Sequence, residues 1–434
     1  MNGIEIISMK RVLIIAYDYP PNKSIGGARP ESWIAHFPKF GVKPFLVSRI
    51  WDGSLESDVS LVKPSERQKV EVVKNDDYEL RFVPFKPVLR DEFLIKYGNN
   101  KYSSIRKVFT LYHKLFDFQI LPPVFKAIKN EAQKVVNENK IDIILVTGEP
   151  FLLFKVAKDL SKTNNIPWIA DYRDCWTSER VKVNSGGIDR FLLDHFFSKI
   201  ENSVVNTATL ITTPAPSYQK DLKSVFPNKR VETIFNGYFE EKVSDEILRQ
   251  NQETEVLTIA YVGILYPHQK LELFLQALDS VVARTPQKIK VIFIGLDFYP
   301  DQKKRVLDFK SKGTLDVECT PKLSYDIMIH ELKKINICLL LSSKGADWLN
   351  TKIFDYLLVN REVLLVENDE GILSRILSET NSGTAISTLN EIEAYLERKL
   401  IEFKENGKVI EPSKSEGFSR LNQSEKLCEL IKEL

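Results

Sequence analysis

The chain alternates short runs of Val, Ile and Leu with segments of helical periodicity, and this pattern restricts its fold more than any other feature. Parallel sheets produce such runs when helices cover both of their faces, because the strands are then buried on both sides. In the first half, strands are predicted at 12–16, 44–47, 81–83, 143–147, 168–170 and 210–213. The pattern starts again in the second half with 257–262, 290–294, 337–341 and 363–366. We therefore expect two Rossmann-like α/β domains.

The length supports the same division, since 434 residues exceed the size at which a single core usually stops growing. Residues 240–255 are polar with few apolar side chains, and we interpret them as the linker. The predicted domains are 1–240 and 241–417, followed by a closing segment, 418–434. That segment is expected to form an amphipathic helix, because five apolar residues lie on roughly one side of it: Leu421, Leu427, Leu430, Ile431 and Leu434.

Composition narrows the class of protein further. Lys and Arg number 61 against 59 Asp and Glu, and this near-neutral balance argues against a nucleic-acid binder that neutralises phosphates. Residues 1–8 lack the layout of a secretory signal, and no run of about 18 apolar residues is present. We expect a cytoplasmic protein, with peripheral membrane contact left open. The four cysteines lie far apart, which indicates neither a zinc site nor a disulfide framework: Cys175, Cys319, Cys338 and Cys428.

The turn after the first strand contains two adjacent glycines, Gly26 and Gly27, shortly before Arg29. Such glycines permit positive φ and let a substrate approach backbone N–H groups at the start of the next helix. A plain turn is the alternative, and the glycines alone favour it. No GxGxxG is present, which disfavours an NAD site.

A second group of charged residues, Asp171, Arg173 and Asp174, follows the strand predicted at 168–170. Residues at the carboxyl end of a parallel strand lie in the ligand-binding crevice, where an Arg can hold a carboxylate or meet a phosphate. An Asp–Arg pair that ties the loop to a neighbouring helix explains the same residues.

The second half opens with a turn in which Gly263 would let the chain pass close to a diphosphate. Tyr266, His268 and Lys270 could line a nucleotide there, although a lone His in such a turn is more often a surface residue than a catalyst.

The segment 342–356 combines a helix start with charge. Asn350 or Thr351 can cap a helix whose N–H groups face the crevice, Lys352 supplies a point charge, and Asp355 lies one turn further on. This arrangement suits a diphosphate and a ribose. An ordinary capped amphipathic helix is compatible with it.

At these positions the sequence resembles the retaining glycosyltransferases of family 4, which have the GT-B fold. Five segments carry the resemblance in this order along nearly the whole chain: 11–17, 171–174, 234–237, 261–263 and 352–357. The resemblance implies an N-terminal acceptor domain, a C-terminal nucleotide-sugar domain, a central cleft between them, and a last helix that crosses back to the N-terminal domain.

The resemblance also implies roles for single residues. Gly26 and Gly27 would lie near the transferred sugar and acceptor, and Arg173 with Asp174 would replace the His-Asp pair of many relatives. The family's Glu-x7-Glu pattern maps onto Asp347 and Asp355, each one methylene shorter. Asp355 would bind the ribose hydroxyls and Asp347 the donor sugar, while the N–H groups of two residues would bind the diphosphate: Asn350 and Thr351.

The sequence departs from the family at the first C-terminal turn. An Arg that many relatives carry after the glycine is Ile264 here, and the usual Lys-Gly pair is Lys270 followed by Leu271. The diphosphate charge must then be met by Lys270, Lys352 or a helix terminus.

The implied reaction moves a hexosyl unit from a nucleotide diphosphate sugar, with UDP favoured, to a glycan or lipid-linked glycan in surface-polysaccharide assembly. The donor is a co-substrate, and neither a resident cofactor nor a bound metal is expected. Two alternatives stay open: a nucleotide-sugar 2-epimerase, and a non-catalytic transferase-like subunit that binds glycans.

Residues 96–129 interleave cations with aromatic side chains. This mixture suits an anionic bilayer surface, where apolar side chains sink in and cations stay at the headgroups. A helix whose aromatic face covers its own domain explains the segment as well, and is the explanation we favour from sequence.

Overall fold

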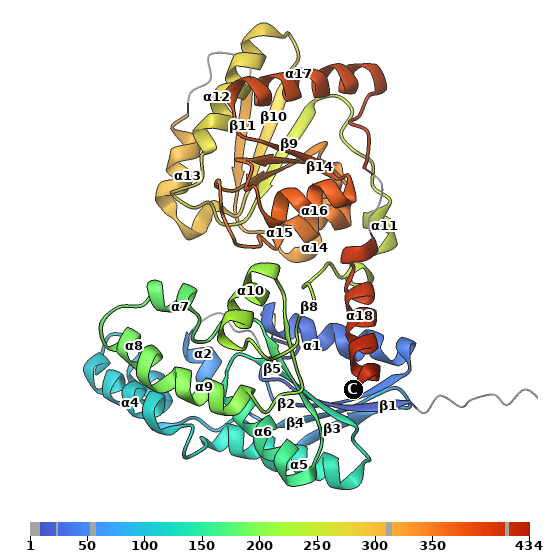
Figure 1. Ribbon diagram of the computed structural model, residues 1–434. Helices are drawn as coiled ribbons and strands as arrows, with labels where there is room; N and C mark the ends of the chain where they lie inside the picture. The colour runs from blue at the N-terminus through green and yellow to red at the C-terminus, as the bar shows by residue number, and fades with distance from the viewer. Residues whose placement is uncertain (1–8, 23–24, 53–57, 310–314, 413–415) are drawn as a thin grey trace, which may run out of the picture. The chain divides into compact units, whose positions relative to one another are not determined.

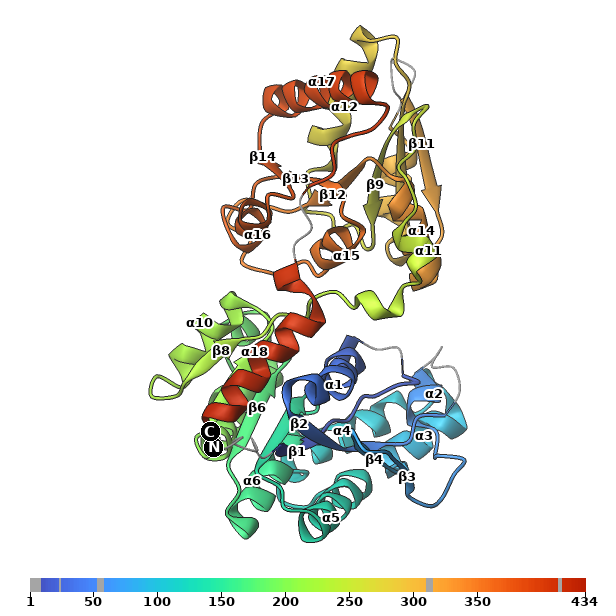
Figure 2. The same cartoon turned by 90° about the vertical axis from the view of Figure 1, so that its right-hand side faces the viewer.

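The computed structural model describes residues 9–22, 25–52, 58–309, 315–412 and 416–434. The chain forms two compact units, Met1–Phe235 with Gln423–Leu434, and Asn236–Asn422 (Figures 1 and 2). Residues 1–8, whose sequence lacks a secretory signal, lie outside the described residues. Within the described part of the chain, no helix is long and apolar enough to cross a membrane.

The first unit contains an eight-stranded sheet that is parallel except for its antiparallel β3–β4 edge pair. From the central strand β1, the chain first adds β2 on one side and later adds β5, β6 and β7 on the other side. The order across the sheet is β3 (Glu71–Lys74), β4 (Glu79–Val83), β2 (Val42–Arg49), β1 (Lys10–Ile15), β5 (Ile143–Gly148), β6 (Trp168–Tyr172), β7 (Leu210–Thr213) and β8 (Val231–Thr233). The reversal between β1 and β5 is where a parallel sheet opens a ligand-binding crevice.

Helices pack on both faces of this sheet because its central strands are apolar on both sides. One core joins the sheet to α5 (Pro123–Glu138), α6 (Leu152–Asn164), α9 (Ser198–Val205) and α10 (Pro216–Val225). The other joins it to α1 (Ile25–His36) and α18 (Arg420–Glu433). The remaining helical segments are η1 (Phe37–Phe40), α2 (Asp58–Val62), α3 (Leu89–Tyr97), α4 (Ser103–Phe116), α7 (Glu179–Val183), α8 (Gly187–Leu192) and η2 (Leu193–Phe197).

The second unit is built on a six-stranded sheet that is parallel throughout. Its order is β11 (Leu315–Thr320), β10 (Ile289–Ile294), β9 (Leu257–Val262), β12 (Ile337–Leu341), β13 (Glu362–Val366) and β14 (Gly383–Ile386). Here the strand order reverses between β9 and β12, so the carboxyl ends of these two strands mark the equivalent crevice.

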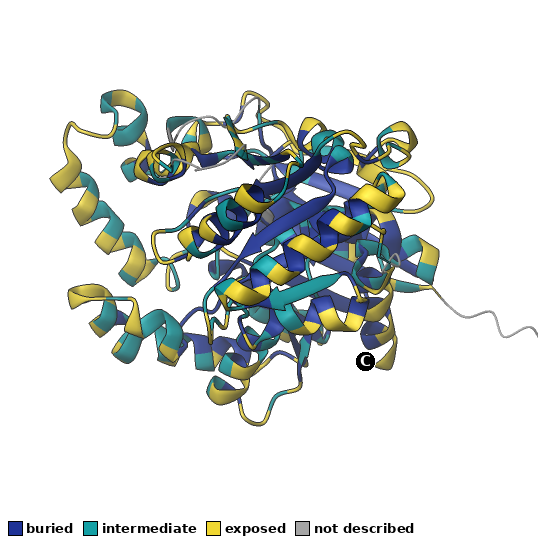
Figure 3. Cartoon of the chain, turned by 90° about the horizontal axis from the view of Figure 1, so that it is seen from above, coloured by how far each residue is buried: buried dark blue, intermediate teal, exposed yellow. Residues whose placement is uncertain are grey.

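Helices α12 (Leu271–Arg284) and α17 (Leu389–Asn406) share the main core of the second unit with its sheet. Figure 1 shows α14 (Tyr325–Lys334), α15 (Lys352–Val359) and α16 (Ile372–Thr380) on the other side of the sheet. The remaining segments are η3 (Glu240–Lys242), α11 (Asp245–Leu248), η4 (Leu296–Phe298), α13 (Pro300–Leu307) and η5 (Glu416–Phe418). In Figure 3 the interior strands are dark blue, which marks them as buried.

The predicted fold class is confirmed: two Rossmann-like domains, with a last helix that returns to the first of them. Leu427, Leu430 and Ile431 of α18 lie in the same core cluster as strand β1. All ten predicted strands are present. The segment interpreted as the linker, 240–255, instead contains η3 and α11 and belongs to the second unit, where Gln252 is buried and hydrogen-bonded to Asn336.

Candidate functional site

The first turn of the second unit brings Gly263 against the side chain of Lys352. Gly263 directly follows β9 and has a φ of +104°, a conformation that strains any residue with a Cβ. A Cβ built there would lie 3.4 Å from Cε of Lys352. The stem of Lys352 therefore lies against this turn, which follows the carboxyl end of β9.

The N-terminus of α15 adds polarised amides to this edge. Thr351 is the N-cap of α15 but its side chain makes no capping hydrogen bond, whereas Oδ1 of the preceding Asn350 accepts the N–H of Lys352 at 3.1 Å. Among the residues that the structure describes, no acceptor binds the N–H groups of Asn350 and Thr351. Unsatisfied amides at a helix N-terminus carry partial positive charge and bind anions.

Lys352 and Asp355 form an ion pair of 3.2 Å, with side chains 33% and 15% exposed. Both groups therefore remain in contact with solvent. Burial and the neighbouring Asp355 carboxylate raise the pKa of Tyr325. Asp347 lies exposed on the loop after β12.

Lys270 pairs with Glu367, a residue that the sequence analysis missed. The Lys270 Nζ lies 2.6 Å from Oε1 of Glu367, which directly follows β13. Gln269 is buried and fixes this loop, because it accepts the N–H of Tyr266 at 2.9 Å and donates to Leu341 O at 2.8 Å. The signal for Glu367 is its place immediately after the strand predicted at 363–366.

Aromatic rings from three loops gather beside this turn. Tyr266 stacks on His268 with ring centroids 5.7 Å apart, and meets Trp348 edge-on at 6.0 Å. Tyr299, from the loop after β10, lies 6.1 Å from Tyr266. Flat aromatic surfaces of this kind can stack a planar ligand group.

In the first unit, Arg173 lies directly over Gly26. Its Nη1 is 3.1 Å from Oδ2 of Asp18, and its Nε donates to Gly148 O at 2.9 Å. A Cβ built on Gly26 would lie 1.3 Å from that Nη1. Gly26 thus makes room for the guanidinium group at the reversal between β1 and β5. A Cβ on Gly27 would lie 3.3 Å from Asn22 O.

Arg29 and Asp171 bind each other inside the first unit. Two hydrogen bonds of 2.6 and 3.1 Å join them, and Thr212 Oγ1 donates to Asp171 at 2.7 Å. The Arg29 Nη1 also donates to Ile234 O at 2.8 Å. The side chains of Arg29 and Asp171 are 5% and 0% exposed. This pair ties α1 to β6, whereas Arg173 pairs with a different aspartate.

Asp174 lies near two groups that the sequence analysis did not select. Tyr218 Oη donates to Asp174 at 3.3 Å, and burial raises the pKa of Tyr218 to about 12. Burial and the carboxylates of Asp174 and Asp18 raise the pKa of Glu149, which Arg173 opposes. Glu149 comes just after the strand predicted at 143–147, and that position is the signal that could have found it.

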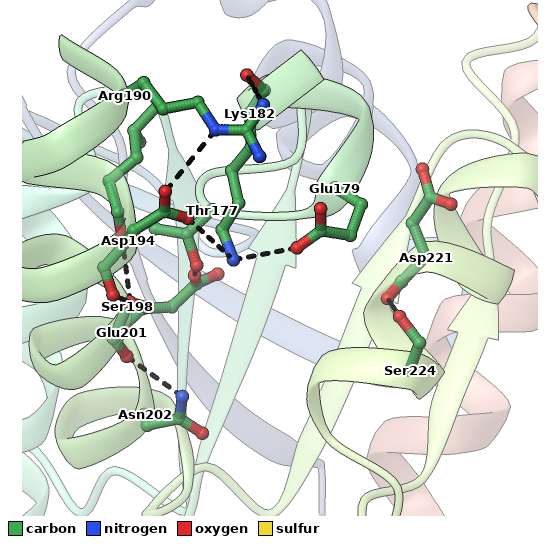
Figure 4. A network of polar contacts seen from close by, with 11 residues as sticks. Thr177, Glu179, Lys182, Arg190, Asp194, Ser198, Glu201, Asn202, Asp221 and Ser224 are labelled. Atoms are coloured by element: carbon green, nitrogen blue, oxygen red, sulfur yellow. Dashed lines mark hydrogen bonds and ion pairs between the residues drawn. The ribbon is translucent and has the colours of Figure 1, made fainter. Parts of the chain in front are cut away.

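Beneath the Asp174 loop, a buried carboxyl group anchors the chain. Tyr172 Oη donates to Glu201 at 2.7 Å, and Thr177 donates to its other oxygen. Burial raises the pKa of Glu201 to about 7. Figure 4 shows the surrounding contacts, in which Lys182 links Glu179 at 2.9 Å and Asp194 at 3.4 Å. Glu201 is enclosed by the unit's own side chains and serves its structure.

Within the described residues, no three His, Cys, Asp or Glu side chains are grouped so that they could hold a metal ion. No protein-family model and no curated protein sequence gives a match to the chain.

Solved structures do match, and they share the GT-B fold of glycosyltransferases. Sucrose-phosphate synthase of Thermosynechococcus elongatus is 12% identical, with a TM-score of 0.56 and 98% of each chain covered. The catalytic domain of starch synthase IV of Arabidopsis thaliana, bound to ADP and acarbose, is also 12% identical, with a TM-score of 0.55 and 98% of each chain covered. Anabaena HepE with UDP and glucose is again 12% identical and reaches 0.53, covering 98% of this chain and 100% of that one. The two-domain GT-B architecture is thereby established for this chain.

Proposed function

We propose that the chain is a retaining glycosyltransferase of family 4. It moves a hexosyl unit from a nucleotide diphosphate sugar to a glycan or lipid-linked glycan, in the cytoplasm and for surface-polysaccharide assembly. The GT-B fold supports the class of enzyme. UDP is the first nucleotide to test, because the structure of HepE contains UDP and glucose.

One observation carries the proposal: the N-terminus of α15 offers two amides that have no acceptor among the described residues, beside the partly exposed ammonium group of Lys352. A diphosphate needs several donors and positive charge at close range, and Asn350, Thr351 and Lys352 supply both. Gly263 leaves space for the phosphates, and Asp355 can accept the ribose hydroxyls. Tyr266 and Trp348 provide aromatic surface for the base.

In the proposed reaction, this helix end stabilises the departing diphosphate electrostatically. The acceptor hydroxyl attacks the anomeric carbon on the face that the diphosphate leaves, and passes its proton to a diphosphate oxygen. The C–O bond to the diphosphate breaks as the new glycosidic bond forms. No protein nucleophile and no metal is needed. Arg173 and Asp174 orient the acceptor, and Asp347 holds the donor sugar.

A thermal-shift screen against UDP, GDP and ADP sugars identifies the donor. Incubation with the stabilising sugar, with and without acceptor glycans, then separates three classes of protein. Acceptor-dependent nucleotide release with retained anomeric configuration supports the proposal. A new nucleotide sugar indicates an epimerase, and glycan binding without turnover indicates a non-catalytic subunit.

Lys352→Ala tests the diphosphate site directly. We expect the dissociation constant of the donor to rise by on the order of tenfold, the value of one charge-assisted contact, and turnover to fall. Lys155→Ala is the matched control, because Lys155 pairs with Asp159 at 3.1 Å on a helix of the first unit. Unchanged donor binding in Lys352→Ala would refute the assignment.

A further inference from the structure

Helix α4 presents an apolar stripe to solvent. Ile105, Val108, Tyr112 and Phe116 are 42%, 67%, 47% and 45% exposed. Their spacing of three and four residues places them on one face of the helix. No residue of α4 is buried. The stripe is therefore not the face by which the helix covers its own domain.

A different face of α4 holds it to the protein. The ring of Phe109 lies 5.7 Å from that of Phe93 on α3. Phe118 and Phe125, further along the chain, pack against the main core of the unit. From sequence, we favour a helix whose aromatic face covers its own domain. That explanation holds for these phenylalanines but not for the exposed stripe.

The charge on α4 and the segment before it is positive. Residues 93–116 contain five Lys or Arg and no Asp or Glu, in a chain whose cations and anions number 61 and 59. Lys107 is exposed on α4, and Lys114 Nζ lies 2.6 Å from Oδ1 of Asp189 on α8. That ion pair places α8 beside α4, and α8 adds Ile188 and Phe191, which are 68% and 61% exposed.

We propose that α4, with the neighbouring part of α8, is a docking surface for an anionic lipid bilayer. The apolar side chains would enter the headgroup boundary while the cations stay at the phosphates. The same positive charge opposes pairing with a second copy of the chain, because two such faces would repel each other. This surface lies outside the candidate donor and acceptor residues, so the proposal is independent of the proposed function.

Vesicle sedimentation of the full chain tests the surface. We expect it to pellet with vesicles of phosphatidylcholine and phosphatidylglycerol, and to stay in the supernatant with phosphatidylcholine alone. Lys107→Ala should lower the partition coefficient roughly fivefold, the effect of one cation near an anionic surface. Val108→Glu, which places an anion within the stripe, should lower it by on the order of tenfold or more.

Matched controls keep the result specific. Ile401→Glu changes an apolar residue on α17 that is 59% exposed, against 67% for Val108, and Lys304→Ala removes an exposed cation from α13. Both should bind as the unmodified protein does, and circular dichroism should show all four variants folded. No pelleting with anionic vesicles, or equal loss in the controls, would overturn the proposal. So would a dimer in light scattering that Val108→Glu abolishes, since a second copy would then cover the stripe.

Discussion

The two sheets carry similar charged residues at their carboxyl edges but use them differently. In the first unit, Arg29 and Asp171 are almost fully enclosed and hold α1 to β6. In the second, Lys352 and Asp355 form a longer pair of 3.2 Å that remains partly exposed. A buried ion pair has already lost its hydration, and a ligand that displaced one partner would leave the other charge uncompensated. A partly exposed pair can exchange partners at little cost.

This difference in exposure is consistent with our proposal that the second unit binds the anionic donor. There, the charges stand beside amides of α15 that have no acceptor among the described residues. In the first unit, Arg173 is both ion-paired and partly accessible, because it pairs with Asp18 yet keeps 17% of its side chain exposed. The same residue types thus serve structure or binding according to how completely the protein itself satisfies them.

The largest expected effect contrasts the two aspartates. Asp171→Ala removes the carboxylate that compensates the buried charge of Arg29, so we expect the free energy of unfolding to fall by about 3–5 kcal/mol. Asp355→Ala should lower it by about 1 kcal/mol or less, because its pair is partly solvated. Urea denaturation measures both. Similar losses in the two variants would contradict the comparison.

A second prediction concerns Glu201, whose pKa is raised from 4.5 to about 7 by burial. Between these values the unfolded chain ionises while the folded chain keeps the proton, so stability falls as the pH rises. Glu201→Gln removes this penalty and should be more stable by about 3 kcal/mol above pH 7, with no difference below pH 4.

Urea titrations at several pH values measure this effect. Glu405→Gln, an exposed position on α17, is the control and should leave the pH dependence unchanged. A parallel shift of Glu201→Gln at all pH values would show that Glu201 acts through packing and not through its proton.

The sequence predicted the interior of both sheets and missed their edges. The four unpredicted strands, β3, β8, β11 and β14, are the outer strands of the two sheets. An edge strand is covered on fewer sides, so it needs no continuous apolar run; Val72 and Val73 of β3 are about half exposed, at 51% and 50%. Strand β8 has only three residues.

For the candidate site, the sequence indicated which loops carry the charged residues but not how those residues pair. Loops after buried strands were identified because the carboxyl ends of parallel strands share one edge. The pairing of charged residues was not predicted, because partners such as Arg29 and Asp171 lie 142 positions apart and meet only in the folded chain. Asp171 and Arg173 are close in sequence, but the structure pairs Asp171 with Arg29 of α1 and Arg173 with Asp18 in the loop after β1.

A third prediction ranks two further lysines of the second unit, Lys270 and Lys344, by their effect on donor binding. Lys270 is 58% exposed and pairs with Glu367, so it offers a screened charge. Lys270→Ala should raise the donor dissociation constant about fivefold, less than Lys352→Ala. Lys344→Ala should change it less than about twofold, since Lys344 is a more exposed cation that pairs with Glu370. Calorimetric titration with the donor checks the ranking, and an effect of Lys344 larger than that of Lys270 would reverse it.

The smallest change in stability is expected at Gly26. An added methyl group must displace Arg173, but Arg173 is a flexible side chain and Ala suits a helix, so the free energy of unfolding should change by less than about 1 kcal/mol. Turnover should still fall by on the order of tenfold, because the guanidinium loses its position. Gly186→Ala, which adds a methyl group to open space, should leave stability and turnover unchanged.

A double variant tests whether Gly26 acts through Arg173. If Arg173 depends on its place over Gly26, the double variant Gly26→Ala, Arg173→Ala loses no more turnover than Arg173→Ala alone. Additive losses would mean that the two residues contribute separately.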